Sequence, residues 1–402
     1  MALRVVLVAA LALGHGGAVR AEPLLESAGS SPTLIIYSAK GPPNSCGEGC
    51  DRWIAVEGIV DRAAASRINR FLHEMKDTTR PIYFNSPGGV MGQALTIGRL
   101  LRVHGGIARI GRTIATACAA GSQFDDACFK IKTSGLEVEA EISTDRASCN
   151  SACSYMFFGA TTREVAPDAV MAVHNPRLVP VGKASSEVIA ALRDRSMVQV
   201  DLEQTSFIAA MGISRELGDL IETVKFENPH ALTRPELYRF GIDTRTMAET
   251  AWTLERAEHP SVRKVVQTRI GNGSTFRTRQ WRLFCENRER ARLVFARESD
   301  TGEAGTVSVT LTAGSEKSLA FGKFPVFAGR YEVWNDTLAP NSIKTLLEAP
   351  RLQMREVFTA PDGKTNVSFV DIDNSGLGRG WAELLTSCPT TPGAGDHRVA
   401  GH

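Results

Sequence analysis

Three short segments of this chain contain the residue types needed for a nucleophilic site. The turn Asn85-Ser86-Pro87-Gly88-Gly89 has adjacent glycines, which let backbone approach a ligand and point N–H groups at an anion. Ser151 opens a small-residue segment expected to be a helix, where free N–H groups could stabilise an oxyanion beside an attacking hydroxyl. His174 ends an apolar run and could accept the proton of that hydroxyl.

Each segment also has an interpretation without chemistry. Ser-Pro-Gly-Gly is a favourable turn by itself, and a serine at a helix start is commonly an N-cap. A histidine at a strand end is commonly a core residue. The functional interpretation therefore depends on all three segments occurring together in one chain.

The elements between these segments alternate between strand and helix patterns. Strand patterns occur at 33–38, 53–60, 81–84, 107–117 and 169–174, and helical patterns at 61–75, 90–103, 148–158 and 185–221. This alternation predicts an α/β domain with a parallel sheet over 22–243. Residues 118–145 are irregular and polar, and we interpret them as an insertion in that domain.

The pattern changes after about residue 250 to short alternating segments. It predicts a smaller all-β domain, a sandwich or barrel, over 263–388. Residues 244–262 would be a linker, and the Gly/Thr/Pro-rich tail 389–402 is expected to be disordered. The tryptophans here are expected in the core rather than on an exposed binding surface. The expected strands are 264–268, 281–285, 292–296, 306–312, 330–334, 352–358, 366–372 and 380–385.

Composition excludes several classes of protein. A length of 402 residues suggests two domains, and 43% hydrophobic with 22% charged residues is a globular balance, not that of a disordered chain. The 46 basic and 44 acidic residues leave a net charge of +2, which gives no support for nucleic-acid binding.

The N-terminal segment, residues 1–21, has the pattern of a cleaved signal peptide. Arg4 precedes the apolar run 5–13, which is too short to span a bilayer. We therefore expect a periplasmic or secreted protein without stable membrane insertion. An uncleaved membrane anchor is the alternative.

The eight cysteines agree with export, since disulfides persist in oxidising compartments. Cys285 and Cys388 are expected to form a disulfide because they are the only pair within the C-terminal third. Cys46 and Cys50 close a small loop or pair with each other. A zinc site is the alternative, disfavoured by export and by the lack of matching histidines, so we expect no metal and no cofactor. Three pairings remain open for Cys118, Cys128, Cys149 and Cys153.

Taken in order, the segments resemble the proteolytic subunit of the Clp protease, in the ClpP/crotonase superfamily. The resemblance spans roughly 53–245. It implies a spiral of ββα units and an enzyme, a serine endopeptidase (a hydrolase), that cleaves peptide bonds through an acyl-enzyme. The matching segments are Glu57-Gly58-Ile59-Val60, the turn 85–89, Ser151-Ala152 ahead of Phe157-Phe158-Gly159-Ala160, Met171-Ala172-Val173-His174-Asn175-Pro176, and Leu232-Thr233-Arg234-Pro235-Glu236-Leu237 with Gly241-Ile242-Asp243.

The resemblance assigns a catalytic role to each matching residue. Ser151 corresponds to the nucleophile and His174 to the general base. The backbone N–H of Gly88 or Gly89 and that of Ala152 correspond to the oxyanion hole.

This chain departs from the family pattern in three respects. The family has an Asp shortly before its closing segment, whereas residues 225–230 contain none. Asn228 is expected to orient His174 instead, with Glu227 as the alternative. The 118–145 insertion could cover the site or block the assembly of subunits into the family's ring. A homo-oligomer is therefore one possible state of this chain. The family's ATP-driven partner is cytosolic, which implies ATP-independent activity for an exported chain.

Three functions therefore compete at this stage. The first is an exported, ATP-independent serine peptidase whose partners are peptide or protein substrates. The second is a catalytically silent ClpP-like fold that binds peptide or protein in the cell envelope, favoured by the missing Asp. The third is a crotonase-type acyl-CoA enzyme, which export opposes because CoA is cytosolic.

Overall fold

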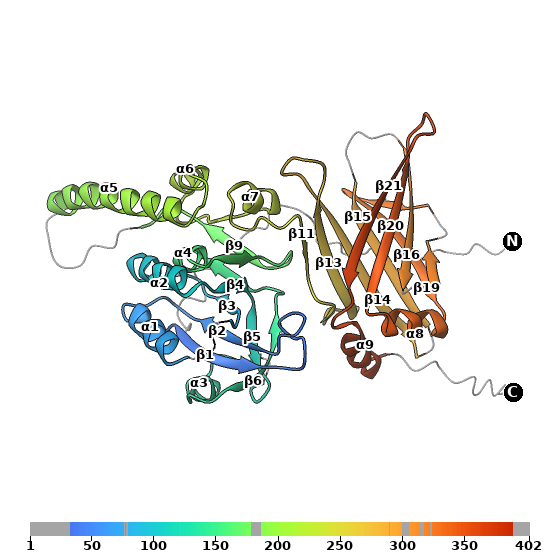
Figure 1. Cartoon of the computed structure of the whole chain (residues 1–402), viewed down its shortest axis with the longest axis horizontal. Coiled ribbons are helices and arrows are strands. Elements are labelled where there is room, and N and C mark those ends of the chain that lie inside the picture. Colours follow the sequence, from blue (N-terminus) through green and yellow to red (C-terminus); the bar gives the residue numbers. More distant parts are fainter. Residues whose placement is uncertain are drawn as a thin grey trace, which may run out of the picture.

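The computed structural model describes residues 33–388 except for 76, 78, 120, 178–185, 289, 300–304, 314–316 and 322–323. The described residues form a mixed α/β protein with several sheets. Figure 1 shows an N-terminal α/β part beside a C-terminal part of long strands. The signal expected at 1–21 and the tail expected at 389–402 lie outside the described residues.

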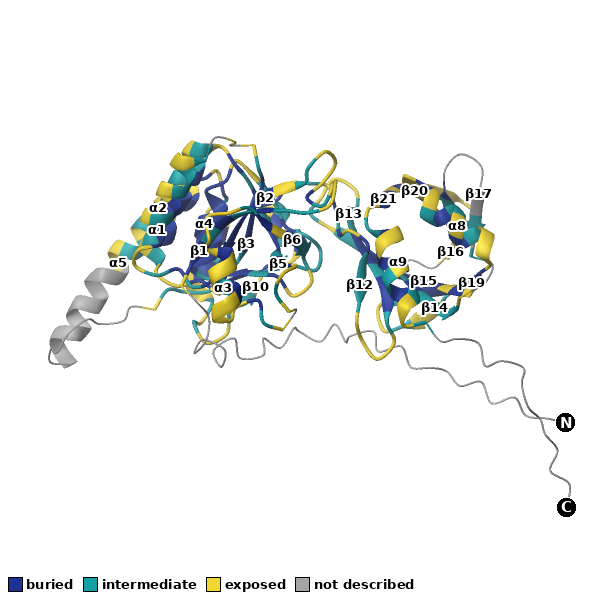
Figure 2. Ribbon diagram, turned by 90° about the horizontal axis from the view of Figure 1, so that it is seen from below, coloured by how far each residue is buried: buried dark blue, intermediate teal, exposed yellow. Residues whose placement is uncertain are grey.

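A seven-stranded sheet forms the centre of the N-terminal part. Its strands are β1 (Ile35–Lys40), β2 (Arg52–Glu57), β3 (Ile82–Asn85), β4 (Ile107–Ile110), β5 (Arg112–Ala115), β6 (Val138–Ser143) and β8 (Thr162–Glu164). The order is β5-β6-β1-β2-β3-β4-β8, with β2, β3, β4 and β8 parallel. Helices α1 (Ala64–Glu74) and α2 (Met91–His104) connect the parallel strands, and their apolar sides pack with Ile54 and Phe84. Figure 2 shows this sheet as mostly buried.

A second, three-stranded sheet has the order β10-β9-β7. Its strands are β7 (Ser148–Asn150), β9 (Val170–Val173) and β10 (His230–Ala231). β7 and β9 are parallel, and a bridge between Ser86 and Cys149 joins the end of β3 to β7. Part of the expected helix at 148–158 is therefore strand, and the helix begins at residue 152. Four further helices of this part follow β7: α4 (Ala152–Phe158), α5 (Ser186–Ala210), α6 (Glu216–Thr223) and α7 (Arg234–Arg239).

The expected insertion at 118–145 is fixed to the first sheet. It contains α3 (Asp126–Lys132) and β6, and β6 pairs with both β1 and β5. The Lys132 ammonium lies 2.8 Å from the Glu57 carboxylate, and both side chains are only 1% exposed. Tyr37 donates a hydrogen bond of 2.8 Å to the same carboxylate. A buried ion pair and backbone pairing therefore anchor this segment.

The C-terminal part contains two antiparallel sheets and, among its described residues, two helices. One sheet has the order β11-β13-β14-β15-β19-β18, with β12 paired to β13, and the other has the order β17-β16-β20-β21. The strands are β11 (Met247–Glu249), β12 (Thr253–Glu255), β13 (Ser261–Arg269), β14 (Phe276–Asn287), β15 (Arg290–Glu298), β16 (Thr306–Ala313), β17 (Lys317–Ala320), β18 (Val326–Ala328), β19 (Tyr331–Leu338), β20 (Arg351–Thr359) and β21 (Thr365–Asp373).

The all-β prediction for this part is wrong because of α8 (Pro340–Glu348) and α9 (Leu377–Thr386). Residues 380–385, expected as a strand, belong to α9. Leu377, Trp381 and Leu384 recur at helical spacing and are all buried, so the periodicity is helical. None of the described helices is long and apolar enough to cross a membrane.

The core of the C-terminal part contains the four tryptophans placed there by the sequence analysis: Trp252, Trp281, Trp334 and Trp381. A disulfide joins Cys285 to Cys388, the pairing expected from the sequence, across a separation of 103 residues. In the chain-entropy model, closing a loop of this length stabilises the fold by about 4–5 kcal/mol. The other disulfides are Cys46–Cys50, Cys118–Cys128 and Cys149–Cys153.

The segment expected to be a linker, 244–262, contributes strands to the C-terminal part. β11 and β12 lie within it, and both pair with β13. Helix α7 makes one of the contacts between the two parts. Tyr238 packs edge-on against Phe276, with ring centroids 5.6 Å apart, and its hydroxyl accepts a hydrogen bond of 2.5 Å from Arg269.

Asp243, fully buried where the two parts join, accepts hydrogen bonds from several groups. Its carboxylate lies 2.7 Å from Arg234 and 2.6 Å from Arg245, and it accepts a bond from the Val165 N–H. Burial raises the pKa of Asp243, but the hydrogen bonds and charges of Arg245 and Arg234 outweigh that effect and hold the pKa well below its usual range. The ionised carboxylate thereby ties the end of the α/β domain to β8.

We predict that Asp243→Asn lowers the free energy of unfolding by about 3–5 kcal/mol, because it leaves Arg234 buried without its counter-charge. Urea unfolding measures this, with the exposed Asp219→Asn as the matched control. Because the folded pKa is lowered, the contribution of Asp243 is complete above the ordinary value of 3.8 and declines as the pH falls below it. The difference between wild type and Asp243→Asn should therefore shrink below pH 3.8; a constant difference would contradict this account.

Candidate active site

Ser151 forms the turn between β7 and α4. Its backbone has φ 56° and ψ −123°, a region that residues other than glycine rarely occupy. Among the described residues, the other non-glycine positions with positive φ are Asn44 and Arg146. Ser151 is half-buried, whereas its neighbours Asn150 and Ala152 are buried. A strand–serine–helix turn of this kind exposes a nucleophilic hydroxyl in α/β hydrolases.

The backbone on both sides of Ser151 is held in place. The Ser151 N–H donates a hydrogen bond of 2.8 Å to the carbonyl oxygen of Ala172 in β9. Cys149 and Cys153, both fully buried, form a disulfide that brackets the serine. The strained turn is therefore closed by a covalent ring as well as by strand pairing.

The glycine turn after β3 packs directly on the serine turn. Gly88 has φ 103° and Gly89 has φ 142°. A Cβ added to Gly88 would lie 2.7 Å from the Asn150 carbonyl oxygen and 2.7 Å from the Ser151 Cβ. A Cβ added to Gly89 would collide with the Val60 backbone. Only glycine allows both the conformation and this approach.

Two N–H groups remain as candidate oxyanion donors at this junction. The Gly88 N–H donates to the Ser86 hydroxyl at 3.1 Å, and the Ser151 N–H donates to the Ala172 carbonyl oxygen. The Ser151 N–H is therefore not one of the free N–H groups expected at the start of this helix. In the described part of the chain, the N–H groups of Gly89 and Ala152 donate to no other protein group. They are the pair that could bind an oxyanion.

His174 directly follows β9, next to the strand that leads into Ser151. The parallel register pairs Asn150 with Ala172, so Ser151 is level with Val173, one residue before the histidine. The imidazole Nδ1 lies 2.8 Å from the backbone carbonyl oxygen of Asn175. A proton on Nδ1 donated to that carbonyl leaves Nε2 as the basic nitrogen. Between Ser151 and His174, the described atoms form no hydrogen bond.

The expected orienting residue, Asn228, makes no described hydrogen bond to His174. It is exposed, and its backbone N–H donates to the carbonyl of Lys225. The alternative, Glu227, is also exposed. The segment reaches the histidine through Phe226, whose ring lies edge-on to the imidazole with centroids 4.7 Å apart.

Asn175 and Phe226 are therefore the contacts of His174 that sequence reasoning missed. A backbone carbonyl has no residue signature, so nothing in the sequence could identify the first. Phe226 lies in the segment 225–230 where a partner of His174 was expected, but an aromatic residue does not indicate a hydrogen-bonding partner.

Known proteins give no direct guide to this site. A scan against protein-family models found no matching family, and a search of curated proteins found no matching sequence. All eight cysteines form disulfides, and within the described ranges no cluster of three or more His, Cys, Asp or Glu side chains could hold a metal ion. What the chain does must be inferred from its own residues.

We predict that Gly88→Ala lowers the free energy of unfolding by about 2–4 kcal/mol, because its Cβ would displace the serine turn and its φ is unfavourable for alanine. Gly92→Ala is the matched control, since a Cβ there meets nothing within 4 Å and alanine favours the helix. Thermal and urea unfolding of both variants measures the effect. Equal stability of the two variants would contradict the close approach of the two turns.

Proposed function

We propose that this chain is an exported serine peptidase of ClpP-like fold that hydrolyses peptide bonds at Ser151 without ATP. The observation that carries the proposal is the strained strand–serine–helix turn, with the glycine turn packed on it and a histidine at the adjacent strand end. Four parallel strands with crossover helices, followed by a second small sheet, support a spiral of the ClpP/crotonase type.

The geometry gives each group a role in acyl transfer. The Ser151 hydroxyl oxygen attacks the peptide carbonyl carbon while its proton passes to His174 Nε2. The N–H groups of Gly89 and Ala152 stabilise the oxyanion. The imidazolium then protonates the leaving amine, which departs and leaves an ester on Ser151. A water molecule, deprotonated by the same imidazole, hydrolyses the ester and releases the second product.

The covalent structure and the N-terminal sequence both support an exported location. Four disulfides are typical of chains that fold in an oxidising environment, and the signal pattern at 1–21 agrees. We therefore propose a periplasmic or secreted location. An ATP-driven unfoldase is not expected there, which supports ATP-independent cleavage of accessible peptide segments.

A second candidate is a catalytically silent ClpP-like fold that binds peptide. It is favoured by the arrangement around His174, where the described atoms form no hydrogen bond to Ser151 and no carboxylate bonds to the imidazole. Catalytic hydrogen bonds are often loose before substrate binds, so this geometry is also compatible with the peptidase that we propose.

We predict that the folded, oxidised protein reacts with a fluorophosphonate at Ser151. Ser151→Ala should abolish the adduct, and His174→Ala should slow its formation by about 100-fold or more, because the hydroxyl loses its base. Ser148→Ala, three residues away in β7, is the matched control and should react like wild type. Mass spectrometry of the digested protein locates the adduct. An unreactive folded protein would favour the silent binding fold, and an adduct elsewhere would refute the role of Ser151.

We also predict that Asn228→Ala changes the rate of this reaction by less than about threefold. The Asn175 carbonyl, and not Asn228, faces the His174 Nδ1. The variant should therefore keep the tautomer with its proton on Nδ1. If Asn228 did orient the imidazole ring, the Asn228→Ala substitution would lower the labelling rate about 10²–10⁴-fold, as loss of the third member does in other catalytic triads. The initial labelling rate of the two proteins at equal concentration separates these outcomes.

A further inference from the structure

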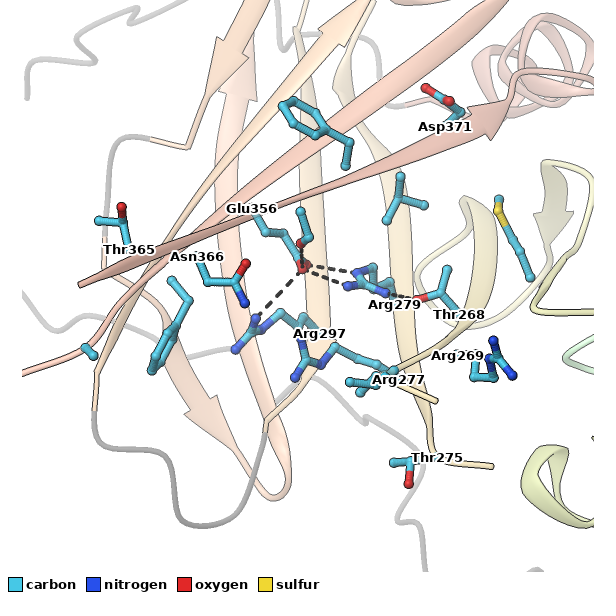
Figure 3. A pocket seen from close by; sticks show the side chains of 18 of the residues that line it. Thr268, Arg269, Thr275, Arg277, Arg279, Arg297, Glu356, Thr365, Asn366 and Asp371 are labelled. Carbon is cyan, nitrogen blue, oxygen red and sulfur yellow. Dashed lines mark hydrogen bonds and ion pairs between the residues drawn. The ribbon is translucent and has the colours of Figure 1, made fainter. Parts of the chain in front are cut away.

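The C-terminal part contains a large cleft whose lining residues lie far from Ser151 and His174 in the sequence. Its volume is about 880 Å³, and it is lined by the ends of β13 and β14 and by β20 and β21. Figure 3 shows Arg277, Arg279 and Arg297 gathered near Glu356, with Asp371 set apart. The volume is many times that of one phosphate or sulfate ion, so the cleft has room for a chain-like ligand.

A buried ion-pair network forms the floor of the cleft. Arg279 makes a two-pronged contact with Glu356, with distances of 2.9 and 2.7 Å, and both side chains are almost fully buried. Arg297 lies 2.7 Å from Glu332 and 3.8 Å from Glu356. Burial raises the pKa of Glu356, but the hydrogen bonds and charge of Arg279, then the charge of Arg297, lower it overall and keep it ionised. This network fixes the arginine planes in place.

Cationic side chains outnumber carboxylates in the lining. Arg269, Arg277, Arg279, Arg297 and Lys364 line the cleft, against Glu356 and Asp371. Glu332 and Asp362, which do not line the cleft, pair with Arg297 and Lys364. Asp371, the second lining carboxylate, accepts a hydrogen bond from Gln353. The arginine side of the cleft therefore favours a negatively charged ligand.

The cleft also runs along the edge of a sheet. β21 is the last strand of its sheet and pairs with β20 on one side only. Most residues from 365 to 371 line the cleft, including Phe369, whose side chain is 58% exposed. An edge strand presents backbone N–H and C=O groups to which an extended peptide can add.

We propose that this cleft binds an extended acidic peptide segment, which pairs with the edge of β21 and places its carboxylates on the arginines. The edge strand favours a peptide over an anionic polysaccharide, because only a peptide backbone matches the spacing of β21. Phe369 would pack on apolar side chains of the same peptide. The proposal stands apart from catalysis at Ser151, since it requires only the C-terminal part of the folded chain.

Binding can be measured on the full-length, oxidised Ser151→Ala protein, so that no probe is cleaved. The probe is a fluorescein-labelled decapeptide of alternating Glu and Val, read by fluorescence anisotropy. We expect this peptide to bind at least about tenfold more tightly than the matched Gln/Val peptide. Its binding should weaken as the salt concentration is raised. A Glu/Val peptide N-methylated at alternate residues should lose binding, because it cannot donate to β21.

Variants locate the site on the protein. Arg277→Gln and Phe369→Ser should each weaken binding of the Glu/Val peptide by about fivefold or more. Arg290→Gln is the matched control, because Arg290 is exposed on β15 outside the lining and should leave binding unchanged. Circular dichroism and thermal unfolding confirm that each variant is folded.

Several outcomes would overturn the proposal. Equal affinity for the Glu and Gln peptides would show that charge is not recognised. Full binding of the N-methylated peptide would exclude addition to β21. Tighter binding of dextran sulfate than of the peptide would assign the cleft to an anionic polymer, and complete displacement by inorganic phosphate at micromolar concentration would assign it to a small anion.

Discussion

The backbone at Ser151 adopts a conformation that an L-residue keeps only where its surroundings prevent relaxation, at a cost of about 1–3 kcal/mol. Three neighbours supply that constraint: the bond from its N–H to Ala172, the Cys149–Cys153 disulfide, and Gly88 packed against it. Each depends on a different part of the α/β domain. The second sheet, the turn after β3 and the Cys149–Cys153 disulfide are therefore all needed to present this one hydroxyl.

Buried ion pairs connect segments that lie far apart in the sequence. Lys132 and Glu57 fix the 118–145 segment to β2, and Asp243 with Arg234 closes the α/β domain where the C-terminal part begins. Arg279 and Glu356 join the two C-terminal sheets and form the floor of the arginine cleft. A buried pair is costly to break because the remaining charge stays buried. These positions should therefore be the least tolerant of single substitutions.

Much of this arrangement could be predicted from residue types and spacing. Strands β1 to β4, the glycine turn, the position of His174 at a strand end and the Cys285–Cys388 pair follow from local patterns, whereas β6 lies in a segment expected to be irregular and β8 was not expected. The expected strand at 380–385 spans less than two turns of helix, which is too short to separate a helical from a strand periodicity. It therefore did not reveal helix α9. The choice between Gly88 and Gly89 as a donor, and the contact of His174 with Asn175, depend on backbone groups whose partners are set only by the fold.

The central claim is that Ser151, His174 and two backbone N–H groups form one acyl-transfer site. The most direct measurement is a crystal structure of the oxidised protein soaked with a peptide boronic acid. We expect a tetrahedral boron bonded to the Ser151 hydroxyl oxygen, with one boron oxygen accepting from the Gly89 and Ala152 N–H groups and another facing His174 Nε2. A peptide bound over an unmodified serine, or a boronate oxygen directed away from both N–H groups, would contradict the account.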